Sequence, residues 1–155
     1  MTRKLIITGG AGFIGCHTAS YFAKKGYAVV IIDNLSRKGS LDNLNWLKNQ
    51  YPITLYKTDI QDNKAVEDIF KKEKIFKAII HLAAQVAVTT SVSNPRNDFN
   101  INALGTLNIL EAVRHYCPNA PFIYSSTNKV YGLLKNVKII EAPKRYEINK
   151  KEGIS

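Results

Sequence analysis

The chain has 155 residues and a formal net charge of +10, from 22 basic and 12 acidic side chains. This length is typical of one domain with a real core, and no apolar run reaches the roughly 18 residues that a membrane span requires. The basic excess suits an anionic ligand such as a nucleotide, and it also suits nucleic acid or an acidic surface. Many of the lysines fall at expected helix ends and in linkers, where they solvate the surface.

Two cysteines, Cys16 and Cys117, show no spacing typical of metal ligands, and the first apolar run is only three residues long. A run this short does not form a signal peptide. We therefore predict a reduced, cytoplasmic protein with no metal site and no membrane partner. Cys16 is expected to pack against a sheet.

A glycine-rich loop follows the first predicted strand, residues 4–8, and leads into the first predicted helix, residues 17–25. Three of its four glycines, Gly9, Gly12 and Gly15, lie three residues apart. Such a loop lets bare backbone approach a pyrophosphate, whose charge the free N–H groups and the dipole of the helix start complement. No Gly-Lys-Ser/Thr follows the glycines, which excludes a P-loop.

Asp33 ends the second predicted strand, residues 28–33, about 20 residues beyond the glycine loop. A carboxylate at this place accepts hydrogen bonds from the adenosine ribose hydroxyls and repels an added 2′-phosphate. Glycines also recur in ordinary turns, but the strand before, the helix after and the acid at this distance together favour a dinucleotide site. Although Arg37 is suited to a 2′-phosphate, Asp33 favours NAD over NADP as the cofactor.

The rest of the chain continues the alternation of short β-branched runs with helical periodicity. Further strands are predicted at 53–57, 78–82 and 121–125, and further helices at 41–48, 64–72 and 98–116. This order predicts an α/β fold, a Rossmann-like doubly wound parallel sheet truncated after about five strands, with its ligand at the carboxyl ends of the strands. The alternation fades after Gly132. We expect residues 1–133 to form an NAD-binding Rossmann domain and residues 134–155 an irregular tail.

Additional motifs follow the later predicted strands. They are Asp59-Ile60, His81-Leu82-Ala83-Ala84-Gln85, Asn102 with Gly105-Thr106, and Ser125-Ser126-Thr127 with Val130-Tyr131-Gly132. Together with the glycine loop, these residues resemble the extended short-chain dehydrogenase/reductase family, which includes NAD-dependent epimerases and dehydratases of nucleotide sugars. The resemblance spans nearly the whole chain. Segments 33–39, 85–91 and 125–132 more narrowly resemble epimerases of CDP-linked dideoxyhexoses.

The resemblance implies roles for individual residues. Those that would bind NAD are Gly9, Gly12, Phe13, Ile14, Gly15, Asp33, Asn34, Ser36, Arg37, Asp59, Ile60, Leu82, Ala83, Ala84, Gln85, Asn102 and Ser125. Those that would line the site of the nucleotide-sugar substrate are Val86, Thr89, Thr90 and Asn128. His81, in contrast, is expected to be a hydrogen-bonded core histidine rather than a proton carrier.

Thr127 is the catalytic candidate. In the family pattern, a hydroxyl at this position bonds the sugar oxygen that is oxidised, beside a Tyr that takes the proton and a Lys that lowers the pKa of that Tyr. The residue alone is equally consistent with the end of a strand or a turn.

Asn128 and Lys129 follow Thr127 where dehydratases of the family commonly carry an Asp-Glu pair. An amide and an amine do not supply the acid-base chemistry of two carboxylates, which favours epimerisation over dehydration. The resemblance then implies transient oxidation at C2 of a CDP-linked dideoxyhexose, with the hydride held on NAD and returned to the opposite face.

The family's Tyr-xxx-Lys pair is the main departure. The only local match, Tyr146 to Lys150, has no apolar helical face and lies five residues from the chain end, too short for a stable docked helix. We therefore expect a chain that covers roughly the N-terminal half of an enzyme, lacks the catalytic Tyr and Lys, and is inactive alone. The apolar face of residues 98–116 predicts a homo-oligomer for the full-length protein or contact with a missing helix.

Three other interpretations remain open. The first is a non-catalytic module that binds or senses NAD, and the second is another nucleotide-sugar 4-epimerase or dehydratase. The third is a nucleic-acid-binding protein, but the sequence shows no helix-turn-helix and no basic stripe, so we expect no nucleic-acid partner.

Overall fold

The computed structural model describes residues 3–74, 76–132 and 139–148. The chain forms two compact units, Met1–Ser125 and Ser126–Ser155. The strands of the first unit are β1 (Lys4–Thr8), β2 (Ala28–Asp33), β3 (Ile53–Lys57), β4 (Ala78–His81) and β5 (Phe122–Tyr124). Its helices are α1 (Phe13–Lys24), α2 (Ser40–Lys48), α3 (Asn63–Glu73), α4 (Val88–Ser93), α5 (Pro95–Phe99), the π-helical turn η1 (Asn100–Leu104) and α6 (Gly105–Tyr116).

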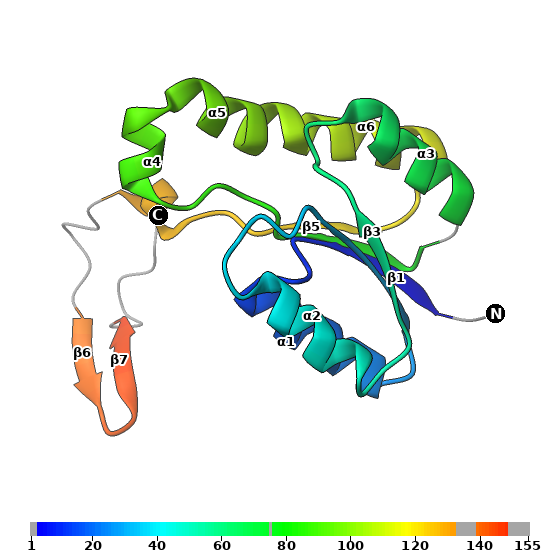
Figure 1. Cartoon of the computed structure of the whole chain (residues 1–155). Coiled ribbons are helices and arrows are strands. Elements are labelled where there is room, and N and C mark those ends of the chain that lie inside the picture. Colours follow the sequence, from blue (N-terminus) through cyan, green and yellow to red (C-terminus); the bar gives the residue numbers. More distant parts are fainter. Residues whose placement is uncertain (1–2, 75, 133–138, 149–155) are drawn as a thin grey trace. The chain divides into compact units, whose positions relative to one another are not determined.

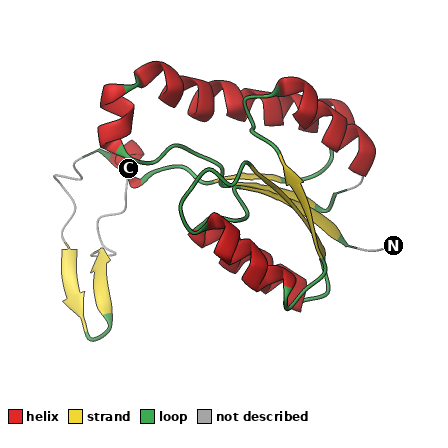
Figure 2. Ribbon diagram, viewed as in Figure 1, coloured by secondary structure: helices red, strands yellow, loops and turns green. Residues whose placement is uncertain are grey.

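The strands of the first unit form one parallel sheet in the order β3-β2-β1-β4-β5. The order reverses at β1, which pairs with β2 on one side and β4 on the other. Helices cover both faces, α1 and α2 on one and α3 and α6 on the other (Figures 1 and 2). The predicted α/β, Rossmann-like, doubly wound parallel sheet is therefore confirmed.

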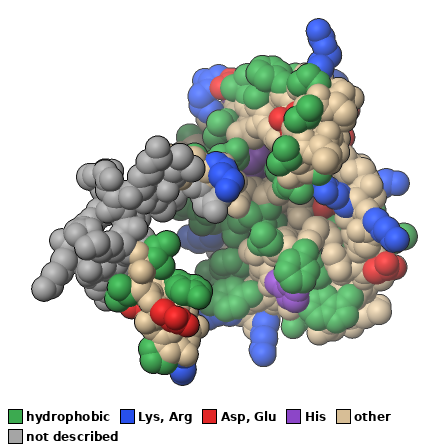
Figure 3. Space-filling model, turned by 90° about the vertical axis from the view of Figure 1, so that its left-hand side faces the viewer, with side chains coloured by type: hydrophobic (Ala, Val, Ile, Leu, Met, Phe, Trp, Pro, Cys, Tyr) green, Lys and Arg blue, Asp and Glu red, His purple; other side chains and the backbone are tan. Residues whose placement is uncertain are grey.

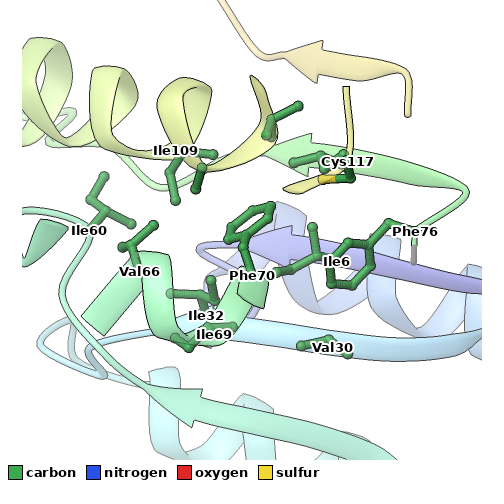
Figure 4. Packing of buried hydrophobic residues seen from close by; sticks show 13 residues of the cluster. Ile6, Val30, Ile32, Ile60, Val66, Ile69, Phe70, Phe76, Ile109 and Cys117 are labelled. Carbon is green, nitrogen blue, oxygen red and sulfur yellow. The ribbon is translucent and has the colours of Figure 1, made fainter. Parts of the chain in front are cut away.

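The two faces of the sheet are buried because the strands are apolar at nearly every position. Successive side chains of a strand point to opposite faces, so Leu5 and Ile7 pack toward α1 and α2, whereas Ile6 packs toward α3 and α6. Figure 4 shows the cluster of buried residues on the α3 and α6 side of the sheet, where Phe70 of α3 lies beside Ile6. Cys16 is buried in the cluster on the α1 and α2 side, against the sheet, as predicted.

The predicted helix over 98–116 is divided in the structure. It comprises α5, η1 and α6, and it begins three residues earlier, at Pro95. The six-residue helix α4 was not predicted, because its sequence, Val-Thr-Thr-Ser-Val-Ser, is made of residues with low helix propensity. Helix α1 also begins four residues before the predicted start, since Phe13 already has helical geometry directly after the extended Gly12.

The second unit differs from the irregular tail predicted for residues 134–155. It contains a short 3₁₀ turn, η2 (Asn128–Tyr131), and an antiparallel hairpin of β6 (Ile139–Ala142) and β7 (Arg145–Ile148). A two-residue connection, Pro143-Lys144, joins the strands, and β-branched isoleucines favour β6. The chain divides after Ser125, before the boundary predicted at 133.

Within the described parts of the chain, no helix is long and apolar enough to cross a membrane. No group of three or more metal-ligating side chains gathers among those same residues.

Asn108 ties α6 to the turn after β3. Its side-chain amide donates to the carbonyl oxygens of Ile60, at 2.9 Å, and Gln61, at 3.2 Å, and the residue is buried. We predict that Asn108→Ala lowers the free energy of unfolding by about 2 kcal/mol in urea titrations, because these carbonyls lose their donor. Asn45→Ala, at an exposed position of α2, should change it by less than about 0.5 kcal/mol. Equal losses would contradict this role.

Candidate dinucleotide site

The carboxyl ends of the central strands lie side by side. Thr8, the last residue of β1, pairs with Ile32 of β2 and with His81 of β4. The predicted residues that follow β1, β2, β3 and β4 therefore lie together at the carboxyl end of the sheet. This is the place expected for a ligand where the strand order of a doubly wound sheet reverses. Figure 3 looks onto this side of the molecule, where many hydrophobic side chains are exposed. Those near the loops include Phe13, Ile14, Val86 and Val88.

The three regularly spaced glycines, Gly9, Gly12 and Gly15, are required for different reasons. Gly9 has φ of +68°, and a Cβ atom there would lie 2.7 Å from the backbone nitrogen of Ala83. At Gly15, a Cβ would overlap the carbonyl oxygen of Gly9 and lie 2.7 Å from Cα of Gly10. The protein's own backbone thus excludes a side chain at both positions.

Gly12 is different. Its backbone is extended, with φ of −70°, and a Cβ there would meet only the Gly9 oxygen, at 3.2 Å. A Cβ atom here would require the Gly9 oxygen to move by only a few tenths of an ångström, so the protein's own backbone excludes a side chain far less strongly than at Gly9 and Gly15. A bare backbone here fits the close approach of a pyrophosphate, which is the role of the middle glycine in dinucleotide-binding loops.

Helix α1 begins at this loop without a side-chain cap and without an acidic residue in its first turn. Among the described residues, no acceptor contacts the N–H groups of Phe13 and Ile14. Unpaired N–H groups at the start of a 12-residue helix, with its positive dipole end, favour an anion.

Asp33 holds two loops together at the end of β2. One carboxylate oxygen accepts the backbone N–H of Ala11, at 3.0 Å, and the other accepts that of Leu35, at 2.8 Å. The first bond joins the glycine loop to β2. Each carboxylate oxygen can accept a further hydrogen bond, so Asp33 can bind a hydroxyl pair while it holds the loop.

Asp59 and Asn34 form a second polar group at the same edge. The Asn34 amide donates to Asp59 at 2.8 Å, and both the backbone and the side chain of Gln61 donate to its other oxygen. Burial acts to raise the pKa of the Asp59 carboxyl, but the hydrogen bonds from Gln61 and Asn34 outweigh it and lower the pKa. Asp59 is therefore an ionised acceptor near neutral pH. Ile60, 4% exposed, packs into the core and offers little side-chain surface.

The loop after β4 is fixed by Asn102. Its side-chain oxygen accepts the N–H of Gln85, at 2.8 Å, and its amide donates to the carbonyl oxygen of Gln85, at 3.0 Å. Asp98 accepts from the same amide and from Ser91. The Gln85 side chain in turn bonds both backbone groups of Ala87. The π-helical turn therefore carries the residue that holds the loop in place, and sequence periodicity does not distinguish such a turn from an α-helix.

Arg37 lies across from this loop and donates to the side-chain oxygen of Gln85, at 3.2 Å. Ser36 donates its N–H to the side chain of Asn34. Leu82 and Ala83 lie partly buried below the glycine loop, and Ala84 is exposed.

The remaining predicted residues lie further along the chain. Val86, Thr89 and Thr90 are exposed, the last two on α4. Ser125 ends the first unit, and its N–H donates to the carbonyl oxygen of His81 at 3.2 Å. Thr127 and Asn128 belong to the second unit. Thr127 caps η2 by accepting the N–H of Lys129, at 3.3 Å, which leaves its hydroxyl proton available to donate.

Tyr146 lies in strand β7, and Lys150 lies outside the described residues. The helical spacing that would bring a Tyr and a Lys one turn apart is therefore not formed at Tyr146.

His81 is 1% exposed and hydrogen-bonded at both ring nitrogens, to Thr8 at 2.6 Å and Thr106 at 3.0 Å. The prediction of a hydrogen-bonded core histidine is confirmed. Burial lowers its pKa from 6.5 to about 4. Sequence reasoning missed both threonines as partners, although each adjoins a glycine of a recognised motif.

Comparisons with known proteins place this geometry in context. The family model described as GDP-mannose 4,6 dehydratase matches residues 6–149. The chain is 48% identical over 143 residues to the CDP-paratose 2-epimerase of Salmonella typhi, covering 92% of this chain and 42% of that protein. The UDP-Glc/GlcNAc 4-epimerase from Campylobacter jejuni superposes with a TM-score of 0.80 at 34% identity, covering 94% of this chain and 44% of the other.

A Thermus thermophilus UDP-glucose 4-epimerase in complex with NAD has a TM-score of 0.63 at 36% identity, covering 73% of this chain and 34% of the other. The chain thus spans less than half the length of these relatives.

The lowered pKa of His81 predicts a pH dependence of stability. Between pH 6.5 and about 4, the unfolded chain binds a proton at this histidine that the folded chain does not. The free energy of unfolding should therefore fall as the pH is lowered through this interval, and His81 alone should contribute about 3 kcal/mol to the fall. Urea titrations of the unchanged chain and of His81→Asn, which keeps a donor and an acceptor, separate this part from carboxylate titration. Parallel curves for the two proteins would contradict the prediction.

Proposed function

The chain belongs to the NAD-dependent epimerase/dehydratase group of extended short-chain dehydrogenases/reductases, and we propose that it is the N-terminal, NAD-binding part of a nucleotide-sugar epimerase. The observation that carries this proposal is the pairing of an open Gly12 with Asp33 at the reversal of the strand order. The first suits a pyrophosphate and the second suits the adenosine ribose.

The residues present fit NAD. The backbone of Gly9, Gly12 and Gly15, with the N–H groups of Phe13 and Ile14, would hold the pyrophosphate. Asp33 would accept the ribose hydroxyls, and Asp59 would accept the adenine amino group. The residues that would surround the adenosine are Asn34, Ser36 and Arg37, whereas the predicted Ile60 is buried in the core and offers the adenosine little side-chain surface. Those that would line the nicotinamide half are Leu82, Ala83, Ala84, Gln85, Asn102 and Ser125.

NAD, when bound, accepts a hydride from the sugar and returns it, so the reaction has no net redox change. Thr127 would donate its free hydroxyl proton to the sugar oxygen that is oxidised. Val86, Thr89, Thr90 and Asn128 would contact the nucleotide sugar.

The finer proposal is epimerisation at C2 of a CDP-linked dideoxyhexose. It is supported by the identity to a CDP-paratose 2-epimerase and by Asn128 and Lys129, which lack the carboxylates suited to dehydration. The exposed leucines of the predicted apolar face, Leu104, Leu107 and Leu110, support self-association of the full-length protein.

A second candidate is a module that binds NAD without turnover. It is favoured by the strand conformation of Tyr146, which does not provide a catalytic Tyr at helical spacing from a Lys. Turnover does not separate the two, because the N-terminal part of an epimerase is also expected to be inactive alone. Calorimetric titration of the NAD-loaded chain with CDP-paratose does. Saturable binding that Thr127→Val weakens indicates part of an epimerase, whereas NAD binding without nucleotide-sugar binding indicates the module.

We predict that Gly12→Ala weakens NAD binding by about tenfold or more in calorimetric titrations, because the new methyl group occupies the pyrophosphate position. The variant should remain folded, since its Cβ would require the Gly9 oxygen to move by only a few tenths of an ångström. Gly15→Ala should instead fail to fold, and Lys24→Ala, at the other end of α1, should bind NAD like the unchanged chain. Unaltered NAD affinity in a folded Gly12→Ala protein would overturn the proposed site.

A further inference from the structure

His81 is a buried, titratable side chain that the proposed reaction does not use. It lies at the end of β4, and its ring stacks on Phe122 and Tyr124 of β5, with centroids 5.8 and 5.7 Å apart. Both ring nitrogens have hydrogen-bond partners, so His81 connects β1 to α6 at the carboxyl end of the sheet.

The hydrogen bonds on both sides of the ring fix which nitrogen carries the proton. The Thr8 hydroxyl oxygen accepts the backbone N–H of Ala83, at 3.2 Å, and shares that of Leu82, at 3.2 Å, with the Thr8 carbonyl oxygen, at 3.1 Å. The Thr106 hydroxyl gives its proton to a backbone carbonyl and so accepts from Nε2, which leaves Nδ1 to accept the Thr8 hydroxyl proton, 2.6 Å away. His81 is therefore neutral, with its proton on Nε2.

Hydrogen bonds on the other side of the ring are donated in the same direction along the row. Nε2–H donates to the Thr106 hydroxyl at 3.0 Å, and Thr106 donates to the carbonyl oxygen of Asn102 at 2.7 Å. Asn102 holds both backbone groups of Gln85 through its side chain. A single directed row of hydrogen bonds thus runs from Thr8 to the loop after β4.

Both ends of this row adjoin the proposed cofactor site. Thr8 directly precedes Gly9, whose Cα packs against the backbone of Ala83. Gln85 lies at the other end, in the loop that would line the nicotinamide half. The geometry points to His81 as a positioning residue that fixes the glycine loop and the loop over residues 82–87 relative to each other, and so raises the affinity for the dinucleotide. This inference rests on the proposed function.

Thr106 offers the cleanest test because it lies in the row without adjoining the glycine loop. Thr106→Val keeps the shape of the side chain but removes the hydroxyl, whereas Thr106→Ser keeps the hydroxyl. We expect NAD affinity to fall by about threefold to tenfold in the valine variant, the worth of one hydrogen bond. The serine variant should remain within about twofold of the unchanged chain.

A second measurement needs no cofactor. Amide hydrogen exchange at Leu82 and Ala83 should accelerate in Thr106→Val but not in Thr106→Ser, since the Thr8 end is loosened through His81. Nitrogen NMR of the His81 ring should show an unprotonated Nδ1 and a protonated Nε2 in the unchanged chain. His81→Asn, which retains a donor and an acceptor, should bind NAD more tightly than His81→Leu.

The proposal requires the affinity and the exchange to change together in Thr106→Val. Equal NAD affinity of the valine and serine variants, unaltered exchange, or a proton on Nδ1 would each overturn it. Lack of NAD binding by the unchanged chain would instead overturn the proposed function, while the exchange and the ring proton would still report on the hydrogen-bonded row.

Discussion

Backbone contact between the glycine loop and the end of β4 is the constraint on which the candidate site depends. Gly9 adopts a positive φ and leaves no space for a Cβ atom beside Ala83. This contact brings the loops after β1 and β4 together, and Asp33 adds the loop after β2 by accepting the N–H of Ala11. Three loops from distant parts of the sequence are thereby fixed as one surface before any ligand binds.

The core supports that surface by holding the strands in register. Apolar side chains alternate to the two faces of β1 and β2, and each face is covered by helices. A slip of one residue would exchange the side chains that pack against the two helical layers, so the close packing of each layer helps to fix where each strand ends. The polar residues that follow those ends then take defined places. Asn108 and Asn102 lie in the helical layer and hold the adjoining loops in place, because their side-chain amides form hydrogen bonds with the loop backbone.

Much of this arrangement could be predicted from sequence because it rests on local patterns. The five strands, the glycine loop and Asp33 follow from periodicity and spacing, and the strands agree with prediction to within one residue at each end. The π-helical turn, α4 and the β6–β7 hairpin have weak local signals and were not predicted. The connection from Thr8 through His81 to Thr106 joins residues far apart in the chain, so no local pattern shows it. The roles proposed for Thr127 and Asn128 stay predictions.

The central claim is that the loops after β1 and β2 form a dinucleotide site. The most direct measurement is an NMR titration of the nitrogen-labelled chain with NAD, following every backbone amide. NAD bound at these loops should give saturable shifts that are largest at Phe13 and Ile14 and extend to the residues around Asp33. Absence of saturable shifts, or shifts confined to residues distant from the glycine loop, would contradict it.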